Sequence, residues 1–427
     1  MRVIRYPDKT TWEQHLARPV IDHSSLFTTV RTILDDVKRD GDKALFAYEA
    51  KFDRALLDCL AVTETEILDA EKQVSEELKT AMRTASRNIE LFHASQQLIP
   101  AKIETSPGVC CWQKAVGIEK VGLYIPGGSA PLFSSVLMLA IPARIAGCKE
   151  IILCSPPNPA GQIHPAVLVA AKLSGVHRIF KVGGAQAIAA MAYGTESIPK
   201  VYKIFGPGNQ YVTMAKQLVG QVDVAIDMPA GPSEVEVIAD DSANPAFVAA
   251  DLLSQAEHGV DSQSVLITTS DTLTEAVQQE LRTQLAALPR AEITVRALDN
   301  SRIILLKDRS EVIEMTNLYA PEHLIIETAD YRELAEEITN AGSVFLGHYS
   351  PESAGDYASG TNHTLPTNGY AKAYNGINLD SFVRKITFQE ISEAGIRNLG
   401  NTIEVLAAGE QLSAHKNAVT LRMTSLK

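Results

Sequence analysis

An amide and an imidazole stand three residues apart in the segment Leu252–Gly259, just before a predicted helix end at Gly259. Positions i and i+3 lie on one face of a helix, so Gln255 and His258 could both reach one metal ion. A closed structural zinc site prefers Cys and His, and we therefore expect a site that uses Gln to be open or shared with a ligand. The same pair also fits a solvated or capping helix face. Its spacing alone leaves both interpretations open.

An adjacent carboxylate and imidazole begin a predicted strand directly after a proline turn. Glu322 and His323 follow Pro321 in this segment. Because His titrates near neutrality, such a pair can act as general acid and base. Neighbouring residues of a strand point to opposite sides, so both side chains reach one substrate only if the pair lies in the turn.

Further carboxylates and imidazoles lie in the last part of the chain. The Gly-, Ser- and Asn-rich stretch Pro351–Tyr374 carries Asp356 and His363, and Glu410 and His415 lie near the end. A long loop of this kind in an enzyme is usually functional or disordered. With the Gln/His pair, Asp356 and His415 form a nitrogen and oxygen donor set suited to Zn²⁺. Spacing cannot show that these residues meet.

Three predicted strands end in glycine-rich turns. The turns are Pro126–Ser129, Gly183–Gln186 and Gly206–Asn209. Backbone amides at such turns and at the following helix N-terminus favour anions such as a pyrophosphate. None has the full G-x-G-x-x-G pattern, so tight strand-to-helix turns without a ligand are the alternative. Three in succession favour a nucleotide-like ligand, for which the turns offer the side chains of Tyr124, Gln186 and Asn209.

The five cysteines lack C-x-x-C spacing and their number is odd, which argues against a disulfide framework. Cys148 and Cys154 flank a predicted strand and are expected to be small buried hydrophobes. Cys110 or Cys111 is a possible nucleophile, although no His lies nearby in sequence. We expect both to be bystanders, so that replacing both with Ser leaves an activity intact.

Composition narrows the function classes. The 427 residues are 45% hydrophobic and 21% charged, with a net charge of −12, which is typical of a globular protein of two or three domains. We expect no nucleic-acid surface, because phosphate binding requires clustered Lys and Arg. The N-terminus lacks the apolar stretch of a signal peptide, and no apolar segment is long enough to span a bilayer. A cytoplasmic protein is therefore expected.

The elements that must position these residues alternate between strands and helices. The first hundred residues are predicted to be helical, with a capping box at Thr63 and Glu66. Two series of strands follow, each strand preceding a turn and a helix: Val121–Ile125, Glu150–Cys154, Arg178–Val182, Val201–Phe205 and Val222–Ile226, and then Glu234–Ala239, Ser264–Thr269, Arg302–Leu306, His323–Glu327 and Ser343–Leu346. The last fifty residues are predicted to be helical. The fold class is α/β, with two Rossmann-like parallel-sheet units and helical extensions at both ends.

Taken together, these segments resemble the histidinol dehydrogenase family. The similar segments are Tyr124–Gly128, Gly206–Asn209, Asp227–Glu234, Ser254–Gly259, Pro321–His323 and Gly360–His363, in that order along the chain. The resemblance runs from about residue 20 to the C-terminus. A series in one order is far more specific than any single motif.

The resemblance implies an enzyme with one Zn²⁺ per subunit that oxidises L-histidinol to L-histidine with two NAD⁺. It implies zinc ligands at Gln255, His258, Asp356 and His415, and an acid/base pair at Glu322 and His323. Substrate contacts would include these ligands and His323, together with Ser233, His363 and Glu410. NAD contacts would fall on Tyr124, Gln186 and Asn209.

The resemblance further implies a homodimer in which His415 and Glu410 complete the site of the partner subunit. It implies an inserted NAD-binding domain, residues 124–234, within a first α/β domain of residues 23–123 and 235–377. An extension, residues 1–22, precedes them, and a helical segment, residues 378–427, reaches the partner.

Two other classes of protein are alternatives. In a zinc-dependent hydrolase Glu322 would activate a metal-bound water, but the three glycine turns would have no ligand. A nucleotide-sensing regulatory subunit would explain the turns but not the many His, Asp and Glu residues.

Overall fold

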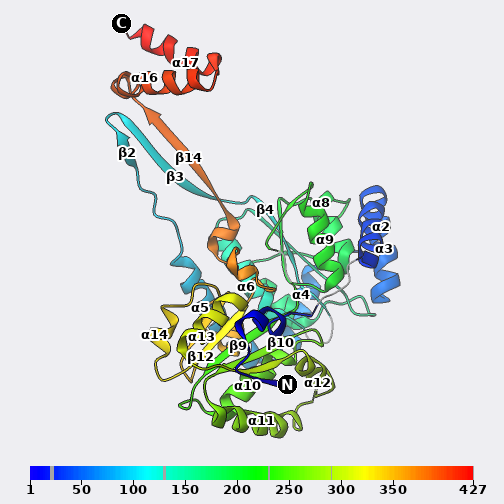
Figure 1. Cartoon of the computed structure of the whole chain (residues 1–427). Coiled ribbons are helices and arrows are strands. Elements are labelled where there is room, and N and C mark those ends of the chain that lie inside the picture. The colour runs from blue at the N-terminus through cyan, green and yellow to red at the C-terminus, as the bar shows by residue number, and fades with distance from the viewer. Residues whose placement is uncertain (20–23, 128–130, 229–230, 290, 427) are drawn as a thin grey trace.

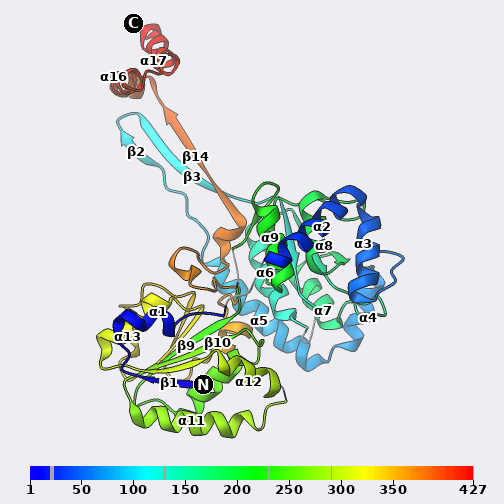
Figure 2. The same ribbon diagram turned by 45° about the vertical axis from the view of Figure 1, so that its right-hand side comes forward.

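Two parallel sheets, each covered by helices on both faces, form the body of the chain in the computed structural model (Figure 1). The structure describes residues 1–19, 24–127, 131–228, 231–289 and 291–426. Part of the first glycine turn, residues 128–130, and the predicted boundary at residue 22 lie outside these ranges. A long arm extends from the body and ends in the C-terminal helices (Figure 2).

The first sheet has five strands in the order β6-β5-β4-β7-β8, all parallel to their neighbours. Its strands are β4 (Lys120–Tyr124), β5 (Glu150–Ser155), β6 (Arg178–Lys181), β7 (Lys203–Phe205) and β8 (Ala225–Ile226). All five predicted strands are confirmed. The chain order reverses between β4 and β7, and ligands of open α/β sheets bind in the crevice at such a point.

Eight helices of the described residues cover this sheet and bury apolar side chains on both faces. One face carries α2 (Ser24–Asp40), α3 (Asp42–Tyr48), α8 (Gly184–Tyr193) and α9 (Gln210–Gly220), and the π-helix η2 (Glu49–Asp53) follows α3. The other carries α4 (Glu64–Gln73), α5 (Glu76–Ala94), α6 (Phe133–Ile145) and α7 (Pro165–Ser174). The capping box at Thr63 and Glu66 is confirmed.

The packing of the N-terminal helices differs from the predicted domain division. Residues 23–123 were assigned with residues 235–377, but α2 packs on α8 and α9, while α4 and α5 pack on α6 and α7. Their apolar faces are therefore buried on the five-stranded sheet. The amphipathic pattern shows that these helices need a partner but does not identify which sheet provides it.

The second sheet has six parallel strands in the order β1-β11-β10-β9-β12-β13. The strands are β1 (Arg2–Arg5), β9 (Glu234–Ala239), β10 (Gln263–Thr268), β11 (Arg302–Leu305), β12 (His323–Glu327) and β13 (Ser343–Leu346). All five predicted strands are present. The sixth, β1, was missed, since residues 1–22 were predicted to be an extension.

Helices cover this sheet on both faces as well. One face carries α10 (Pro245–Ala256), α11 (Asp271–Leu285) and α12 (Ala291–Asp299), and the other carries η1 (Lys9–Thr11), α1 (Trp12–His15), α13 (Arg309–Tyr319) and α14 (Tyr331–Ala335). The predicted loop Pro351–Tyr374 contains a short helix, α15 (Glu352–Tyr357), which packs against α10, and a 3₁₀ turn, η3 (Tyr370–Lys372). The loop prediction was therefore wrong for residues 352–357.

The arm is a three-stranded antiparallel ribbon that carries two helices at its end (Figure 2). It consists of β2 (Ile103–Ser106), β3 (Val109–Gly117) and β14 (Val383–Ile391), then α16 (Glu393–Gly409) and α17 (Ser413–Ser425); the 3₁₀ turn η4 (Leu379–Phe382) leads into β14. The ribbon strands were not predicted, and the C-terminal segment is not entirely helical.

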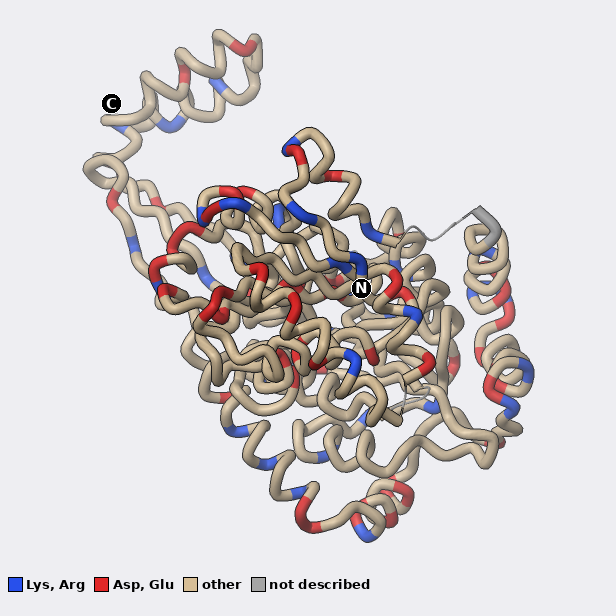
Figure 3. Tube along the Cα trace, turned by 60° about the horizontal axis from the view of Figure 1, so that its bottom comes forward, with Lys and Arg blue, Asp and Glu red and all other residues tan. Residues whose placement is uncertain are grey.

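None of the helices in the described residues combines the length and the apolar composition needed to cross a membrane. Along the described trace, acidic and basic residues are interspersed rather than gathered in one stretch (Figure 3).

Candidate active site

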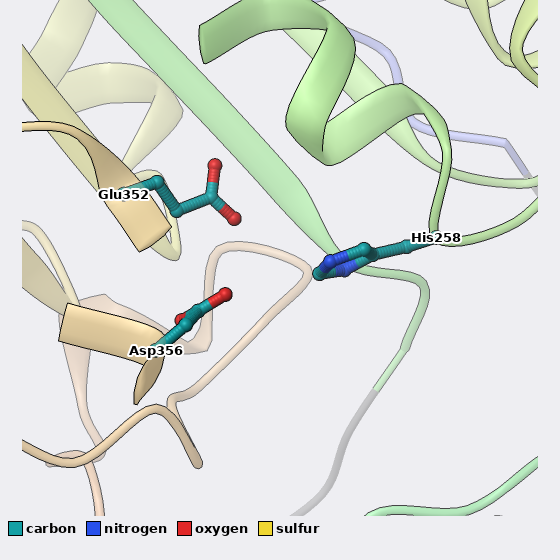
Figure 4. Close-up of side chains that lie close together, drawn as sticks. All are labelled: His258, Glu352 and Asp356. Atoms are coloured by element: carbon teal, nitrogen blue, oxygen red, sulfur yellow. The ribbon is translucent and has the colours of Figure 1, made fainter. Parts of the chain in front are cut away.

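Three side chains that could bind a metal ion converge from α10 and α15. Ligand atoms of His258, Glu352 and Asp356 all lie within 4.8 Å of one another. Glu352 and Asp356 are one turn apart on α15 and point toward His258, which follows the end of α10 (Figure 4). The short helix thus brings two carboxylates, both buried, to one imidazole.

Gln255 lies in the last turn of α10 and has no exposed surface. Among the described residues, neither its Oε1 nor its Nε2 has a hydrogen-bond partner. An unpaired buried amide costs about 1–3 kcal/mol, so this side chain is placed for a ligand rather than for stability. Its backbone carbonyl accepts the N–H of His258 at 3.2 Å, which holds the two residues on one side of the helix end. The donor set fits a divalent cation such as Zn²⁺.

The adjacent pair Glu322 and His323 lies at the start of β12, and both residues are buried. His323 Nδ1 lies 3.7 Å from Glu322 Oε2 and 3.8 Å from Glu352 Oε1, and its Nε2 lies 3.5 Å from Asp356 Oδ1. Both side chains reach one region, because Glu322 lies in the turn before β12 and only His323 belongs to the strand. The chain enters this turn through Ala320, whose φ of 54° is left-handed.

The carboxylates around His323 control its charge. Burial opposes the imidazolium, but Glu352, Glu322 and Asp356 together raise the pKa of His323 to about 10. Burial raises the pKa of Glu322 to about 8, although His323 opposes this shift. The imidazolium balances three carboxylates, a role that a divalent cation would share. Perturbed groups packed this closely are typical of an active site.

Two further predicted substrate residues lie at this site. His363 contacts the carbonyl oxygen of Asp356 through Nδ1 at 2.9 Å and Ser135 Oγ through Nε2 at 3.1 Å. Ser233 and His258 line a cleft of about 1050 Å³ between the two sheets. The cleft therefore connects the candidate metal ligands to the beginning of β9.

The predicted NAD contacts lie at the carboxyl ends of strands in the five-stranded sheet: Tyr124 ends β4, Gln186 lies in the first turn of α8, and Asn209 precedes α9. Asn209 lines the same cleft as Ser233 and caps α9, with its Oδ1 accepting two backbone N–H groups. Tyr124 is buried, and its hydroxyl accepts the N–H of Gly184 at 3.1 Å. Gln186 is also buried and donates to Glu49 Oε1 at 2.9 Å.

The glycines of these turns have protein atoms at the place where a side chain would lie. A Cβ atom at Gly208 would lie 2.3 Å from Val212, and one at Gly127 would lie 2.4 Å from Pro156. Gly206 has a φ of 130°, and a Cβ there would lie 2.1 Å from the carbonyl oxygen of Tyr124. These turns next to the β4/β7 switch point fit a dinucleotide pyrophosphate.

Glu410 and His415 are not brought to this site within one chain. Glu410 ends α16 and His415 lies on α17, both at the end of the arm and exposed (Figure 1). Cys110 and Cys111 lie on β3 of the arm, opposite Glu390 and Gln389 of β14. A nucleophilic role for these thiols therefore has no support from their position.

Glu352 was missed as a candidate residue. Its only sequence signal is the i, i+4 spacing to Asp356, which has meaning only on a helix. The surrounding glycine and serine residues had favoured a loop. Glu49 was also missed: burial raises its pKa to about 8, against the hydrogen bond from Gln186.

The fold and the site define an α/β enzyme with a cation site, an acid/base pair and nucleotide-type turns around one cleft, as in a metal-assisted dehydrogenase. The histidinol dehydrogenase family model matches residues 16–423, and the chain belongs to this family. It is 66% identical to histidinol dehydrogenase of Bacteroides thetaiotaomicron, with 100% of both chains covered. It is 57% identical to that of Escherichia coli K12, over 97% of this chain and 95% of the relative.

A solved structure agrees with this assignment. The crystal structure of histidinol dehydrogenase from Elizabethkingia anophelis has a TM-score of 0.98 to this chain at 54% identity. The match covers 98% of that chain and 100% of this one. The hydrolase and regulatory-subunit alternatives find no support.

Proposed function

We propose that this protein oxidises L-histidinol to L-histidine in two successive NAD-dependent steps, with L-histidinaldehyde as the intermediate. The observation that carries the proposal is the buried amide of Gln255, unpaired among the described residues, next to His258. His258 shares its cluster with Glu352 and Asp356, which in turn lie beside His323. The full-length relatives named above support the choice of substrate.

Gln255, His258 and Asp356 would hold the zinc ion, with His415 of the partner subunit as the fourth protein ligand. The bound ion would orient the substrate by binding its imidazole and amine nitrogens. Glu352 supplies a further carboxylate within the same group. Holding a substrate in a reactive geometry is itself a large contribution to rate.

The turns around Tyr124, Gln186 and Asn209 would hold NAD⁺, which supplies the acceptor for the hydride. Asn209 lines the cleft directly. The buried side chains of Tyr124 and Gln186 instead fix the turn at Gly183 and Gly184. We therefore propose that Tyr124 and Gln186 support the turn that binds the cofactor, in addition to making the predicted contacts with it.

The proton steps belong to the chain's own residues. His323 would accept the hydroxyl proton of histidinol in its neutral form, because a cation held by Asp356 would offset the carboxylate charges that otherwise raise its pKa. The carbinol carbon would lose its hydride to NAD⁺ and become the aldehyde. Glu322 would then accept a proton from the water that adds to the aldehyde, and oxidation of the hydrate gives the carboxylate. A pKa near 8 for Glu322 lies close to neutrality, where a general acid or base works best.

The arm would place Glu410 and His415 in the site of a partner subunit, with Glu410 contacting substrate. Apolar side chains on the arm support an interface: Val405, Leu406 and Leu421 are each more than 60% exposed. Apolar surface of this kind is usually covered by a partner. We also propose a location in the cytoplasm, which suits a chain whose cysteines are all free.

The product ratio tests this proposal. Complete conversion of a limiting amount of L-histidinol should give two NADH and one histidine per histidinol. One NADH with accumulation of the aldehyde would reject the second oxidation.

A further inference from the structure

We propose that Arg18 is a positioning residue that fixes Glu322 and His323 through Glu234. The inference rests on the proposed function, in which these two residues perform the proton steps. Arg18 lies in the N-terminal segment between α1 and the first long helix, far in sequence from either residue.

The guanidinium of Arg18 contacts three groups: the carboxylate of Glu234, and the carbonyl oxygen and the ring of Tyr319. Its Nε and Nη2 bind the two carboxylate oxygens of Glu234, with Nη2 2.8 Å from Oε1. Nη2 also donates to the carbonyl oxygen of Tyr319 at 2.8 Å, and Cζ lies 4.0 Å from the Tyr319 ring centroid. Only an arginine has the planar fork and flat face that make all these contacts at once.

Glu234 in turn binds both members of the acid/base pair through its backbone. Its N–H donates to Glu322 Oε2 at 2.9 Å, and its carbonyl oxygen lies 3.3 Å from His323 Nδ1. Strands β9 and β12 are neighbours with His323 opposite Val235. One residue, held by Arg18 through its side chain, therefore sets the orientation of both catalytic groups.

Arg18 also binds the turn that directly precedes Glu322 and His323. Tyr319 ends α13, and Ala320 follows in the left-handed region with φ 54°, which is strained for a residue with a Cβ. The Tyr319 hydroxyl donates to Gln263 Oε1 at 2.8 Å, and the Gln263 amide donates to the carbonyl of Ala17 at 3.1 Å. The arginine is thus locked from both sides between β9 and the turn.

The position of this ion pair favours a role in the site over one in stability alone. The side chain of Arg18 is 18% exposed and that of Glu234 is 2% exposed, and a buried pair of this kind is weak evidence for stability. Arg18 lines the same cleft as Ser233 and His258. Arg18 therefore links the wall of the cleft to the backbone groups that hold Glu322 and His323.

Arg18→Met tests the proposal when both half-reactions are measured. We expect kcat to fall roughly 100-fold for both histidinol and added histidinaldehyde, the size of effect that a misplacement of about 1 Å produces. The KM for histidinol and the zinc content should remain near wild type. Arg18→Lys keeps the charge without the fork and should give a smaller loss. A wild-type kcat, or a rise in KM alone, would overturn the proposal.

A double variant separates positioning from folding. In Arg18→Met/Glu234→Gln no unpaired carboxylate is left at position 234, while the backbone groups of that residue remain. We expect its melting temperature to recover toward wild type and its kcat to remain low. Recovery of kcat together with the melting temperature would show that Arg18 serves stability alone.

A matched control distinguishes failure of this inference from failure of the proposed function. Arg309 also pairs with two carboxylates, those of Asp330 and Glu337, at the other end of α13. Arg309→Met should keep the wild-type kcat and KM for histidinol. If the wild type and this control produce NADH and Arg18→Met does so equally well, only the role of Arg18 is wrong. If the wild type produces none, the function itself is wrong.

Discussion

The carboxylate of Glu322 accepts the backbone N–H of Glu234 at 2.9 Å across neighbouring strands of the six-stranded sheet. This bond orients one oxygen and satisfies a buried donor of the site. A glutamine at position 322 can still accept the same bond but cannot take a proton. The role of Glu322 can therefore be tested separately from that of His323 without disturbing β12.

His323→Asn should abolish oxidation of histidinol, because no group would remain to accept the hydroxyl proton. Glu322→Gln should still oxidise histidinol slowly. Its rate of oxidation of added histidinaldehyde should fall by a factor of roughly 10²–10⁴, because a general base is lost. Single-turnover NADH formation from each substrate measures the two half-reactions. Equal losses in both half-reactions for both variants would reject this division of roles.

Two buried glutamines provide a matched test of the metal site. The side chain of Gln255 has no hydrogen-bond partner in the part of the chain that the structure describes, whereas that of Gln263 bonds to Tyr319, Ala17 and Asn300. Gln255→Leu should lower the zinc content without lowering the free energy of unfolding measured in chelator, since an unpaired amide is removed. Gln263→Leu leaves buried partners unpaired and should cost about 1–3 kcal/mol. A full equivalent of zinc in Gln255→Leu would exclude Gln255 as a ligand.

Hybrid dimers test whether the arm crosses to the partner subunit. Neither His323→Asn nor His415→Ala homodimers should be active. If the arm crosses, each hybrid has one site with both residues intact, and random reassociation of equal amounts should restore about one quarter of wild-type activity. The NADH rate after mixing, denaturing and refolding the two variants measures this. Absence of activity, with hybrids demonstrated by a mass difference, would contradict a shared site.

Glu236 should make the stability of the protein depend on pH. Burial raises the pKa of this side chain from 4.5 to about 8, so the folded state retains a proton that the unfolded chain releases. Its contribution is fully present below about pH 4.5 and is lost as pH rises to about 8. Glu236→Gln removes this dependence. Between pH 5 and 8 the free energy of unfolding of this variant, relative to wild type, should therefore rise by a few kcal/mol, on the order of the pKa shift. Parallel curves in urea titrations at these pH values would contradict the shift.

The sequence predicted ten strands of the two parallel sheets because each combines a short apolar run with a Gly or Pro turn. It did not predict β2, β3 and β14. Val383–Ile391 is partly or fully exposed along its whole length in the chain, so its alternation cannot be assigned to a core. Strand β1 was missed because four residues at a terminus carry too little periodicity.

At the site, residues that stand next to each other in motifs were identified, whereas those that meet only through folding were not. Glu352 lies 94 positions after His258, and the packing of α15 on α10 alone brings the two together. The same is true of Arg18, which contacts Glu234 although the two residues are more than two hundred positions apart in the sequence. Contacts of this kind depend on which elements pack together, which local patterns do not determine.

The most direct test of a metal-dependent histidinol dehydrogenase activity is NADH formation from L-histidinol and NAD⁺ by the purified protein, before and after removal of bound metal by a chelator. We predict NADH formation by the zinc-loaded protein, its loss after chelation and its recovery on addition of Zn²⁺. Absence of NADH with zinc-loaded protein, or full activity after complete removal of the metal, would contradict the proposal.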